Sequence, residues 1–411
     1  MLKNYLLTAW AVFQRRKLFT LINLACIVLT LVVLLVVTAI LQEAFYPQGV
    51  EHRSERYLQV IQVESLNSKG GWRRGPLGYK LIEKYLKPLP GAEAVAAVTG
   101  IEAASVYLDG RVLDVQMRHA DAEYWRILDF QVLAGRVPSA DDVAHGRMVA
   151  VLNRSTARQL FGQGDAVGQK INVGGQLFEV IGVVQDAMHI NAYADLWVPV
   201  TTYPNTEYRQ QTTGNFMALL MARSPDQLPA LREQVAQAAR KVVYDGPERF
   251  DTTYIWADSK IDTFARIFTE SREVDAHTGR VLGAIAAVML LFMLLPALNL
   301  VNLNIGRIME RATEIGVRKA FGARNGQLVT QLVLENVLLC LAGGALALPL
   351  ARVALWWVEA ISPFKYTQIG LNLAVFGWGL LITIIFGVLS GVIPAWKMAR
   401  LDPVHALKGA V

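Results

Sequence analysis

The chain has 411 residues, of which 53% are hydrophobic and only 18% are charged, and its mean hydropathy is +0.33. These values are unusual for a soluble globular protein and indicate embedding in a lipid membrane. The net charge of +6 does not favour nucleic-acid binding, because residues 42–280 hold 26 Lys and Arg against 29 Asp and Glu. The excess of cations lies in short segments beside apolar runs, so we expect a membrane and no nucleic acid among the partners.

The N-terminal segment, residues 1–17, carries apolar side chains at helical spacing and then the cluster Arg15, Arg16 and Lys17. This pattern predicts a cytoplasmic amphipathic helix at the membrane surface, or a plain extension of the first span. Residues 18–41 are uncharged and long enough to cross a hydrocarbon core of roughly 30 Å. Their length exceeds the roughly 7–15 residues of a signal-peptide core, so we predict an uncleaved anchor.

Residues 42–280 form one large insertion that we expect to fold outside the membrane as an α+β domain. Residues 148–153 read as a strand, and residues 170–184 as a hairpin that turns at Gly174-Gly175. Between them, residues 155–161 read as a helix with Ser155 as a candidate cap. Residues 225–243 read as another helix. Residues 260–280 look helical and charged, and are expected to run into the second span as a stalk.

Three further spans follow, over residues 281–303, 328–356 and 372–396, which makes four transmembrane helices in all. The basic residues lie before the first span, between the second and third, and after the fourth, whereas residues 357–371 offer only Lys365. By the positive-inside rule, both termini, residues 304–327 and the tail 397–411 are cytoplasmic.

Polar residues inside the spans are candidates for function, because burial of polar groups in lipid is costly. They are Asn299, Asn302, Gln331, Glu335 and Asn336. Gln331 and Glu335 share one helix face, although Glu335 is close enough to the cytoplasmic loop to face water or a partner instead. In the fourth span, Gly387 and Gly391 form a GxxxG pattern that allows close approach of two helices.

No motif points to catalysis by this chain. No GxxxxGK[ST] phosphate-binding loop and no GxSxG motif occurs, and the six histidines show no zinc-protease spacing. Both cysteines, Cys26 and Cys340, fall within spans, so neither a disulfide framework nor a zinc site is expected. We predict no catalytic residue, no metal and no directly bound cofactor.

Residues 304–327 are more structured than a plain connection requires. Thr313 is placed to cap a short helix that ends near Gly322, with charges of both signs on one side and apolar residues on the other. Such a helix, joined to two spans, is suited to receive a cytoplasmic partner. The alternative is a solvated positive-inside loop.

The stretch ERATEIGVRKAFGARNGQLVTQLVLEN and the tail IPAWKMARLDPVHALKGA resemble FtsX-like permeases, the family of macrolide-efflux, lipoprotein-release and cell-division permeases. A second block, VLAGRVPSADDVAHGRMVAVLNRSTARQLFGQGDAVGQKINVGGQLFEVIGVVQD, is similar to the extracytoplasmic core domain of macrolide-efflux (MacB-type) permeases. The resemblance covers most of the chain and assigns residues 281–403 to the FtsX-like permease domain.

This resemblance implies the permease subunit of an ATP-binding-cassette (ABC) transporter, in which the loop between the second and third spans contacts an ATPase. Carried over to this sequence, the contact residues are Glu310, Arg311, Glu314, Ile315, Gly316, Arg318, Lys319, Gly322 and Ala323. The best-known macrolide pump carries its ATPase fused at the N-terminus, whereas only 17 residues precede the first span here. We therefore expect ATP to be used by a separate cytoplasmic ATPase subunit.

The leading hypothesis is a permease of the bacterial inner membrane that couples ATP hydrolysis to movement of its periplasmic domain, for efflux or mechanotransmission. The implied partners are the ATPase, a second copy or a paralogous permease in a dimer, and a periplasmic adaptor. The alternative is an FtsX-like platform that activates a cell-wall hydrolase. The coupling loop argues against a third reading, a stand-alone receptor or adhesin.

Overall fold

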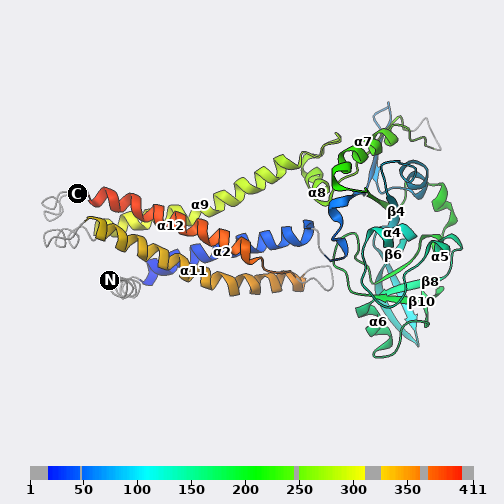
Figure 1. The fold of residues 1–411 in the computed structure, drawn as a ribbon, viewed down its shortest axis with the longest axis horizontal. Coiled ribbons are helices and arrows are strands. Elements are labelled where there is room, and N and C mark those ends of the chain that lie inside the picture. Colours follow the sequence, from blue (N-terminus) through cyan, green and yellow to red (C-terminus); the bar gives the residue numbers. More distant parts are fainter. Residues whose placement is uncertain (1–16, 47–48, 245–249, 311–324, 362–368, 400–411) are drawn as a thin grey trace. The chain divides into compact units, whose positions relative to one another are not determined.

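The computed structural model describes residues 17–46, 49–244, 250–310, 325–361 and 369–399 (Figure 1). The chain divides into two compact units, which are described separately. One comprises residues 1–43, 282–362 and 368–411, and the other comprises residues 44–281 and 363–367. We call them the helical unit and the outer domain.

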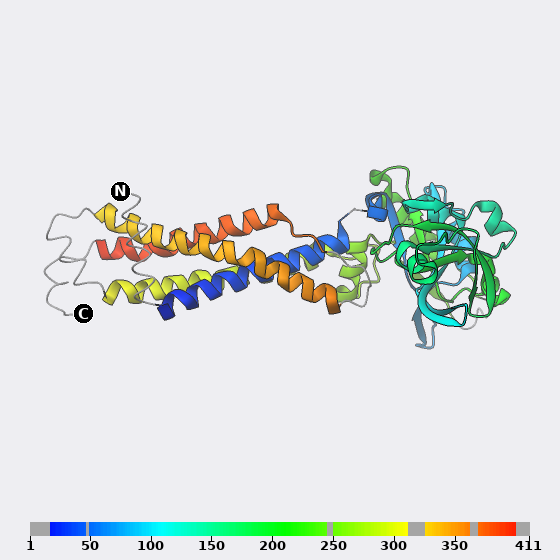
Figure 2. The same ribbon diagram turned by 90° about the horizontal axis from the view of Figure 1, so that it is seen from below.

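Four long helices dominate the described part of the helical unit: α2 (Lys17–Phe45), α9 (Thr278–Glu310), α11 (Asn325–Ile361) and α12 (Leu373–Ala399). Helices α2, α11 and α12 run side by side in both ribbon views (Figure 2). Two stretches, Thr20–Phe45 and Val329–Ile361, are long and apolar enough to cross a membrane, whereas Thr278–Leu294 and Leu373–Leu389 are shorter apolar stretches. The predicted spans over residues 18–41, 281–303 and 328–356 lie within α2, α9 and α11, and the one over residues 372–396 begins one residue before α12. Residues 1–16 lie outside the described part of the chain.

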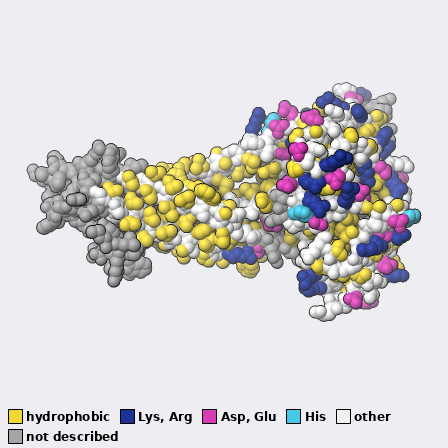
Figure 3. Space-filling view, viewed as in Figure 1, with side chains coloured by type: hydrophobic (Ala, Val, Ile, Leu, Met, Phe, Trp, Pro, Cys, Tyr) yellow, Lys and Arg dark blue, Asp and Glu magenta, His cyan; other side chains and the backbone are white. Residues whose placement is uncertain are grey.

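Helix α2 packs through a stripe spaced by about four residues. Ile27 and Leu31 are fully buried against Leu339 and Cys340 of α11. Spacing of this kind places side chains on one helix face. Other apolar side chains of α2, such as Leu21 and Leu29, are exposed. Figure 3 shows hydrophobic side chains over the visible face of the described helices. An exposed apolar surface of this kind is what a lipid environment accommodates.

Glycines let these helices come close to one another. A Cβ atom added at Gly343 of α11 would lie 2.5 Å from Cγ2 of Ile27, and one at Gly379 of α12 would lie 2.6 Å from Cδ2 of Leu34. Neither position accepts a larger residue unless its neighbour moves. The contacts between α2, α11 and α12 therefore depend on small residues, as in other membrane helix packings.

The outer domain is built on a mixed sheet of ten strands and a second sheet of three strands, so the expected α+β class is confirmed. The strands are β1 (Tyr57–Val60), β2 (Val63–Leu66), β3 (Trp72–Gly75), β4 (Ala94–Thr99), β5 (Glu102–Leu108), β6 (Arg111–Ala120), β7 (Val132–Gly135), β8 (Val149–Asn153), β9 (Lys170–Val173), β10 (Gln176–Val184), β11 (Leu196–Pro199), β12 (Phe216–Met221) and β13 (Thr252–Ile255). The helices are α3 (Tyr79–Leu81), α4 (Ala122–Ile127), α5 (Ala140–Ala144), α6 (Arg154–Phe161), α7 (Leu228–Ala239) and α8 (Lys260–Thr269). Short single turns are η1 (Gly49–Glu51), η2 (Ser54–Arg56), η3 (Ile82–Leu86), η4 (Val200–Thr202), η5 (Thr206–Gln210) and η6 (Pro225–Gln227).

Part of the large sheet closes into a barrel. Strand β6 pairs with β11, which is followed in turn by β8, β10, β9 and β5, and β5 pairs back onto β6. Buried side chains that include Phe178 and Leu152 form a core on these strands. Closure removes the free edges that an open sheet would expose.

The hairpin predicted at Gly174-Gly175 is confirmed. Val173 of β9 is paired with Gln176 of β10, and the two glycines have φ angles of 56° and 92°. A two-residue turn with positive φ at both positions matches the right-handed twist of the flanking strands. The predicted strand at residues 148–153 is also confirmed, as β8.

Three local predictions needed correction. Helix α6 is capped by Asn153, whose side chain accepts a hydrogen bond of 2.7 Å from the Thr156 amide, so Ser155 is not the cap. The helix expected at residues 225–243 is a turn, η6, followed by α7, which ends at Ala239. The stalk expected at residues 260–280 is broken: α8 ends at Thr269 and α9 begins at Thr278.

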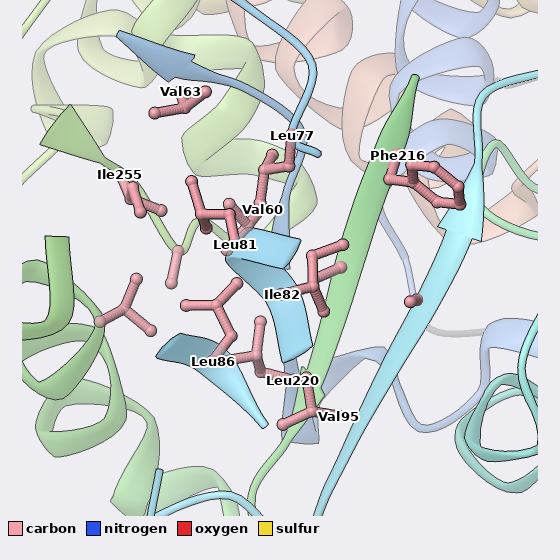
Figure 4. Close-up of a cluster of buried hydrophobic side chains, with 14 of the residues drawn as sticks. Val60, Val63, Leu77, Leu81, Ile82, Leu86, Val95, Phe216, Leu220 and Ile255 are labelled. Atoms are coloured by element: carbon pink, nitrogen blue, oxygen red, sulfur yellow. The ribbon is translucent and has the colours of Figure 1, made fainter. Parts of the chain in front are cut away.

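Three strands beside the barrel, β1, β12 and β4, are covered on both faces, whereas β7, which pairs with β10, is exposed. On β4, Val95 and Ala97 belong to a core shared with α3, η3 and α7, which Figure 4 shows in close-up. The alternate residues Ala94, Ala96 and Val98 belong to a second core with α4. Because side chains alternate across a strand, a fully buried strand requires cover on both faces.

Candidate functional site

The predicted ATPase contact can be placed only in part. Glu310 is the last residue of α9, and α11 begins at Asn325. The remaining predicted contact residues, Arg311, Glu314, Ile315, Gly316, Arg318, Lys319, Gly322 and Ala323, lie outside the described residues. Two long helices therefore flank the segment, and its coupling role remains a prediction.

The polar residues predicted within the spans separate into two groups. Asn299 and Asn302 lie on α9, and their side chains fall outside the described part. Gln331 and Glu335 lie one turn apart on α11, where Nε2 of Gln331 donates a hydrogen bond of 3.2 Å to Oε1 of Glu335. Glu335 is 2% exposed, so this carboxyl group is enclosed by protein within the helical unit.

Asn336 joins α11 to α12. Its Nδ2 donates a hydrogen bond of 3.1 Å to the backbone carbonyl of Gly387, and the side chain is 2% exposed. One turn further on, the Sγ of Cys340 lies 3.6 Å from the carbonyl of Thr383 and donates to it. The structure thus brings together Asn336, a candidate polar residue within a span, and Gly387, a candidate for close helix packing.

Gly387 is a point of close approach between these two helices. A Cβ atom added there would lie 2.8 Å from Sγ of Cys340 and 3.9 Å from Cβ of Asn336. The environment of Gly391, its predicted companion, lies outside the described residues. Cys340 and Thr383 could not be paired with this contact from the sequence, because nothing in one helix indicates which residues of another will face it.

A second polar site lies in the outer domain around Arg266 of α8. Its guanidinium group donates to both carboxylate oxygens of Asp258, at 2.6 and 2.8 Å. The remaining donors reach backbone carbonyls of residues 271, 273 and 274, at 2.6, 2.9 and 3.2 Å. All five donors are therefore used, and the side chain is 2% exposed.

These hydrogen bonds explain why the expected stalk is broken. Glu270 at the end of α8 has φ 48°, in the left-handed region that ends a helix. The carbonyls of the following loop turn toward Arg266 instead of continuing a helix. The segment between α8 and α9, residues 270–277, is thus held in place by the buried guanidinium group, and we call this segment the joint.

Asp262 fastens the start of α9 to α8. Its carboxylate accepts hydrogen bonds from Ser259 in a capping box and from the hydroxyl of Thr278, the first residue of α9, and it pairs with Arg232 at 2.6 Å. Burial opposes ionisation, but the hydrogen bonds from Thr278 and Ser259 and the charge of Arg232 outweigh it and lower the pKa of Asp262. The Ser-x-x-Asp spacing that builds the capping box was readable in the sequence; the bond from Thr278 was not.

The start of α8 is also held by buried polar contacts. Lys260, at the start of α8, pairs with Glu51 at 2.7 Å, and both side chains are almost completely enclosed. The other carboxylate oxygen of Glu51 accepts a hydrogen bond of 3.1 Å from the backbone N–H of Asn191. A buried ion pair that loses one member leaves an uncompensated charge, so these contacts hold α8 firmly against the domain.

The described residues offer no metal site: no three His, Cys, Asp or Glu side chains in them lie close enough to bind one ion. What the arrangement provides is mechanical. Buried polar groups fix the first residue of α9 to α8, and buried polar groups join α11 to α12.

Comparison with known proteins gives two family matches. Residues 20–238 match the MacB-like periplasmic core domain, and residues 286–403 match the FtsX-like permease C-terminal domain. An ABC transporter permease of Bacillus subtilis (strain 168), YknZ, is 26% identical over 79% of this chain and 77% of its own length.

Two further relatives are fused ATP-binding and permease proteins. The macrolide export protein MacB of Chromobacterium violaceum is 28% identical over 69% of this chain and 42% of its own length. The probable syringafactin export protein SyfD of Pseudomonas syringae pv. tomato is 26% identical over 97% of this chain and 58% of its own length. This chain therefore spans about half the length of both. Among solved structures, the extracellular domain of YknZ aligns with a TM-score of 0.38 and 18% identity, covering 48% of this chain and 98% of that domain.

Proposed function

The chain belongs to the family of ABC transporter permeases that carry a MacB-like periplasmic core domain and an FtsX-like C-terminal domain, and from this premise we propose that it couples ATP hydrolysis by a cytoplasmic ATPase to movement of its outer domain. In this proposal the chain has no ATPase activity of its own. ATP is bound and used by the partner, and residues 304–327 receive the partner's motion.

The continuity of α9 is the observation that carries this proposal. One uninterrupted helix runs from Thr278, which is hydrogen-bonded to Asp262 of the outer domain, to Glu310, where the predicted ATPase contact begins. At about 1.5 Å per residue, a helix of 33 residues is about 50 Å long. A continuous helix that starts at a contact with α8 and ends at the predicted ATPase contact is suited to transmit displacement without a separate linker.

The remaining parts of the proposal concern topology and assembly. Helices α2, α9, α11 and α12 cross the bacterial inner membrane, with both termini and residues 304–327 in the cytoplasm and the outer domain in the periplasm. The chain works as a dimer with a second copy or a paralogous permease, and a periplasmic adaptor completes the path outward. The names of the relatives, which refer to macrolide export and probable syringafactin export, favour a role of this chain in export.

Reversing the charges of the predicted ATPase contact tests this function. Arg318→Glu/Lys319→Glu places carboxylates where we expect an acidic or polar docking surface, and like-charge contacts at an interface cost several kcal/mol. At about 1.4 kcal/mol per factor of ten, ATPase affinity should fall by about 100-fold or more. Co-purification of the ATPase and ATPase activity in membranes measure the effect.

Arg73→Glu/Arg74→Glu is the matched control, because both residues are exposed on β3 of the outer domain. It should leave ATPase binding unchanged. The topology should survive the loop variant, since Arg307, Arg311 and Arg324 still supply positive charge there. Wild-type ATPase binding and turnover by the loop variant would show that residues 310–324 are an ordinary solvated loop.

A further inference from the structure

Helix α8 has two faces of opposite character. Lys260, Ala265 and Arg266 are buried against the outer domain. Ile267 and Phe268, in the last turn, are 68% and 66% exposed. These two large apolar side chains form an exposed patch on a domain that is otherwise charged, and such a patch is more stable against an apolar neighbour than in water.

Aromatic contacts connect this patch with the end of α2. The ring of Phe268 lies 5.0 Å from that of Phe264, and Phe264 lies 5.3 Å from Phe45. Phe45 is the last residue of the apolar stretch Thr20–Phe45. The next residue, Tyr46, is 60% exposed.

The same short helix also contacts the start of α9 through the bond between Asp262 and Thr278. The ring contact with Phe45 and the bond to Thr278 therefore place α8 where one apolar helix ends and another begins. At that level a spanning helix leaves the hydrocarbon, and aromatic side chains are enriched there because they tolerate both apolar and polar surroundings.

We infer that the exposed face of α8, formed by Phe264, Ile267 and Phe268, lies in the outer leaflet of the bilayer, with a lipid surface as its occupant. This inference rests on α2 and α9 crossing the membrane, as proposed above. The apolar side chains enter the region between headgroups and acyl chains. The charged side chains of the loop that follows, Glu270, Arg272 and Glu273, are exposed and remain among headgroups and water.

A lipid occupant explains the composition of α8 better than a protein one. The exposed part is short, with Ile267 and Phe268 as its large apolar members, which is little area for a stable protein interface. It is continuous, through Phe264 and Phe45, with an apolar helix end that already meets lipid in this topology. Burial of α8 on its other side through Arg266 and Lys260 fixes the direction in which these side chains point.

Spin-label accessibility of the full chain tests the inference. Single cysteines replace Ile267 or Phe268 in a Cys26→Ser/Cys340→Ala background, and the labelled protein is placed in nanodiscs of phosphatidylethanolamine and phosphatidylglycerol. We expect labels at both positions to be relaxed more strongly by oxygen, which partitions into lipid, than by a water-soluble nickel chelate. The ratio should place them between the headgroups and the upper acyl chains.

Two controls bracket the result. Leu177→Cys lies on β10 of the outer domain, where the native side chain is 56% exposed, and should respond to nickel. Leu29→Cys lies within α2, where the native side chain is 64% exposed, and should respond to oxygen. If Leu29→Cys responds to nickel, the proposed span fails and the inference fails with it.

If Leu29→Cys lies in lipid while both α8 labels respond to nickel as Leu177→Cys does, the span stands and the inference about α8 is wrong. Protection of the α8 labels from both reagents would show a protein occupant, and dipolar coupling between labels would identify it as a second copy. That result would also overturn the lipid assignment.

Discussion

At the scale of single residues, Arg266 is the side chain on which the joint between α8 and α9 depends. It is buried, pairs with Asp258 in a two-pronged contact and holds three backbone carbonyls of the loop that follows. It also lies 5.2 Å from the centre of the Trp256 ring, close enough for a cation–π interaction. No other common side chain offers five donors in a fixed plane, so even lysine is a poor replacement.

Arg266→Ala should therefore lower the free energy of unfolding by about 3–5 kcal/mol, because it leaves Asp258 as a buried, unpaired charge. Denaturant unfolding of the purified full chain in detergent, followed by tryptophan fluorescence, measures the change. Arg126→Ala is the control: its pairing with Glu93 at 3.3 Å is exposed and should contribute only about 0–1 kcal/mol. Equal effects of the two variants would show that the buried contacts of Arg266 contribute no more to stability than an exposed ion pair.

Asp262 gives the joint a pH dependence whose sign follows from its lowered pKa. Its carboxylate stabilises the folded state above the unfolded-state pKa of about 3.9, and this contribution is lost as pH falls through the lower folded-state value. Asp262→Asn should thus be less stable than wild type near neutral pH, and the difference should shrink below about pH 4. Thermal unfolding across that pH range checks the expectation, and a constant difference would contradict it.

At the scale of elements, the contact between α11 and α12 depends on close approach at Gly387. Only Cys340 would clash seriously with a side chain at this position, because its Sγ lies 2.8 Å from the site of the missing Cβ while the atoms of Asn336 are at 3.9 Å. The two residues therefore form a matched pair across the helix contact. Residue 387 must lack a Cβ as long as residue 340 carries an Sγ atom.

Gly387→Ala should destabilise the full chain by about 1–3 kcal/mol, as overpacking of a filled interior usually does. Adding Cys340→Ala removes the Sγ atom and should restore part of the loss. Thermal stability in detergent measures both variants. Gly377→Ala on the same helix, where no atom lies within 4 Å of the missing Cβ, should be tolerated. No rescue by the second change would mean that the helices do not meet at this point.

At the scale of the whole molecule, the proposed topology places the long helices in lipid and the outer domain in water. The described helices are covered largely by apolar side chains, whereas the outer domain carries charges of both signs (Figure 3). Charged side chains face water at little cost, and apolar helices of this length are most stable in lipid.

A single cysteine at Asn325, the first residue of α11, tests the orientation in the Cys26→Ser/Cys340→Ala background. In intact cells it should resist a membrane-impermeant maleimide and react only after permeabilisation. A cysteine at Ser68, exposed in the outer domain, should react from outside once the outer membrane is made permeable. Reaction of the Asn325 position from outside would reverse the proposed orientation.

The local features that the sequence could predict are those set by neighbouring residues. The glycine pair at 174–175 predicted the hairpin, because only a residue without a Cβ readily adopts positive φ at both turn positions. Strand β8 was predicted from its apolar run between polar residues. Charge placement and hydrophobic length predicted the spans, whose positions coincide with long helices, while the residues of the ATPase contact stay a prediction.

The tertiary structure alone decided which distant residues meet. Nothing in the local pattern of residues 260–280 showed a break, because the helix is ended by Arg266 turning back onto the carbonyls of residues 271, 273 and 274. Ser155 yielded the cap of α6 to Asn153, since the end of β8 fixes the backbone there. Barrel closure, the pairing of Asn336 with Gly387 and the contact of Phe45 with Phe264 join residues far apart in the chain. Hydrophobic periodicity determines which face of an element is buried. Which other element covers that face depends on packing and hydrogen bonding among all the elements together.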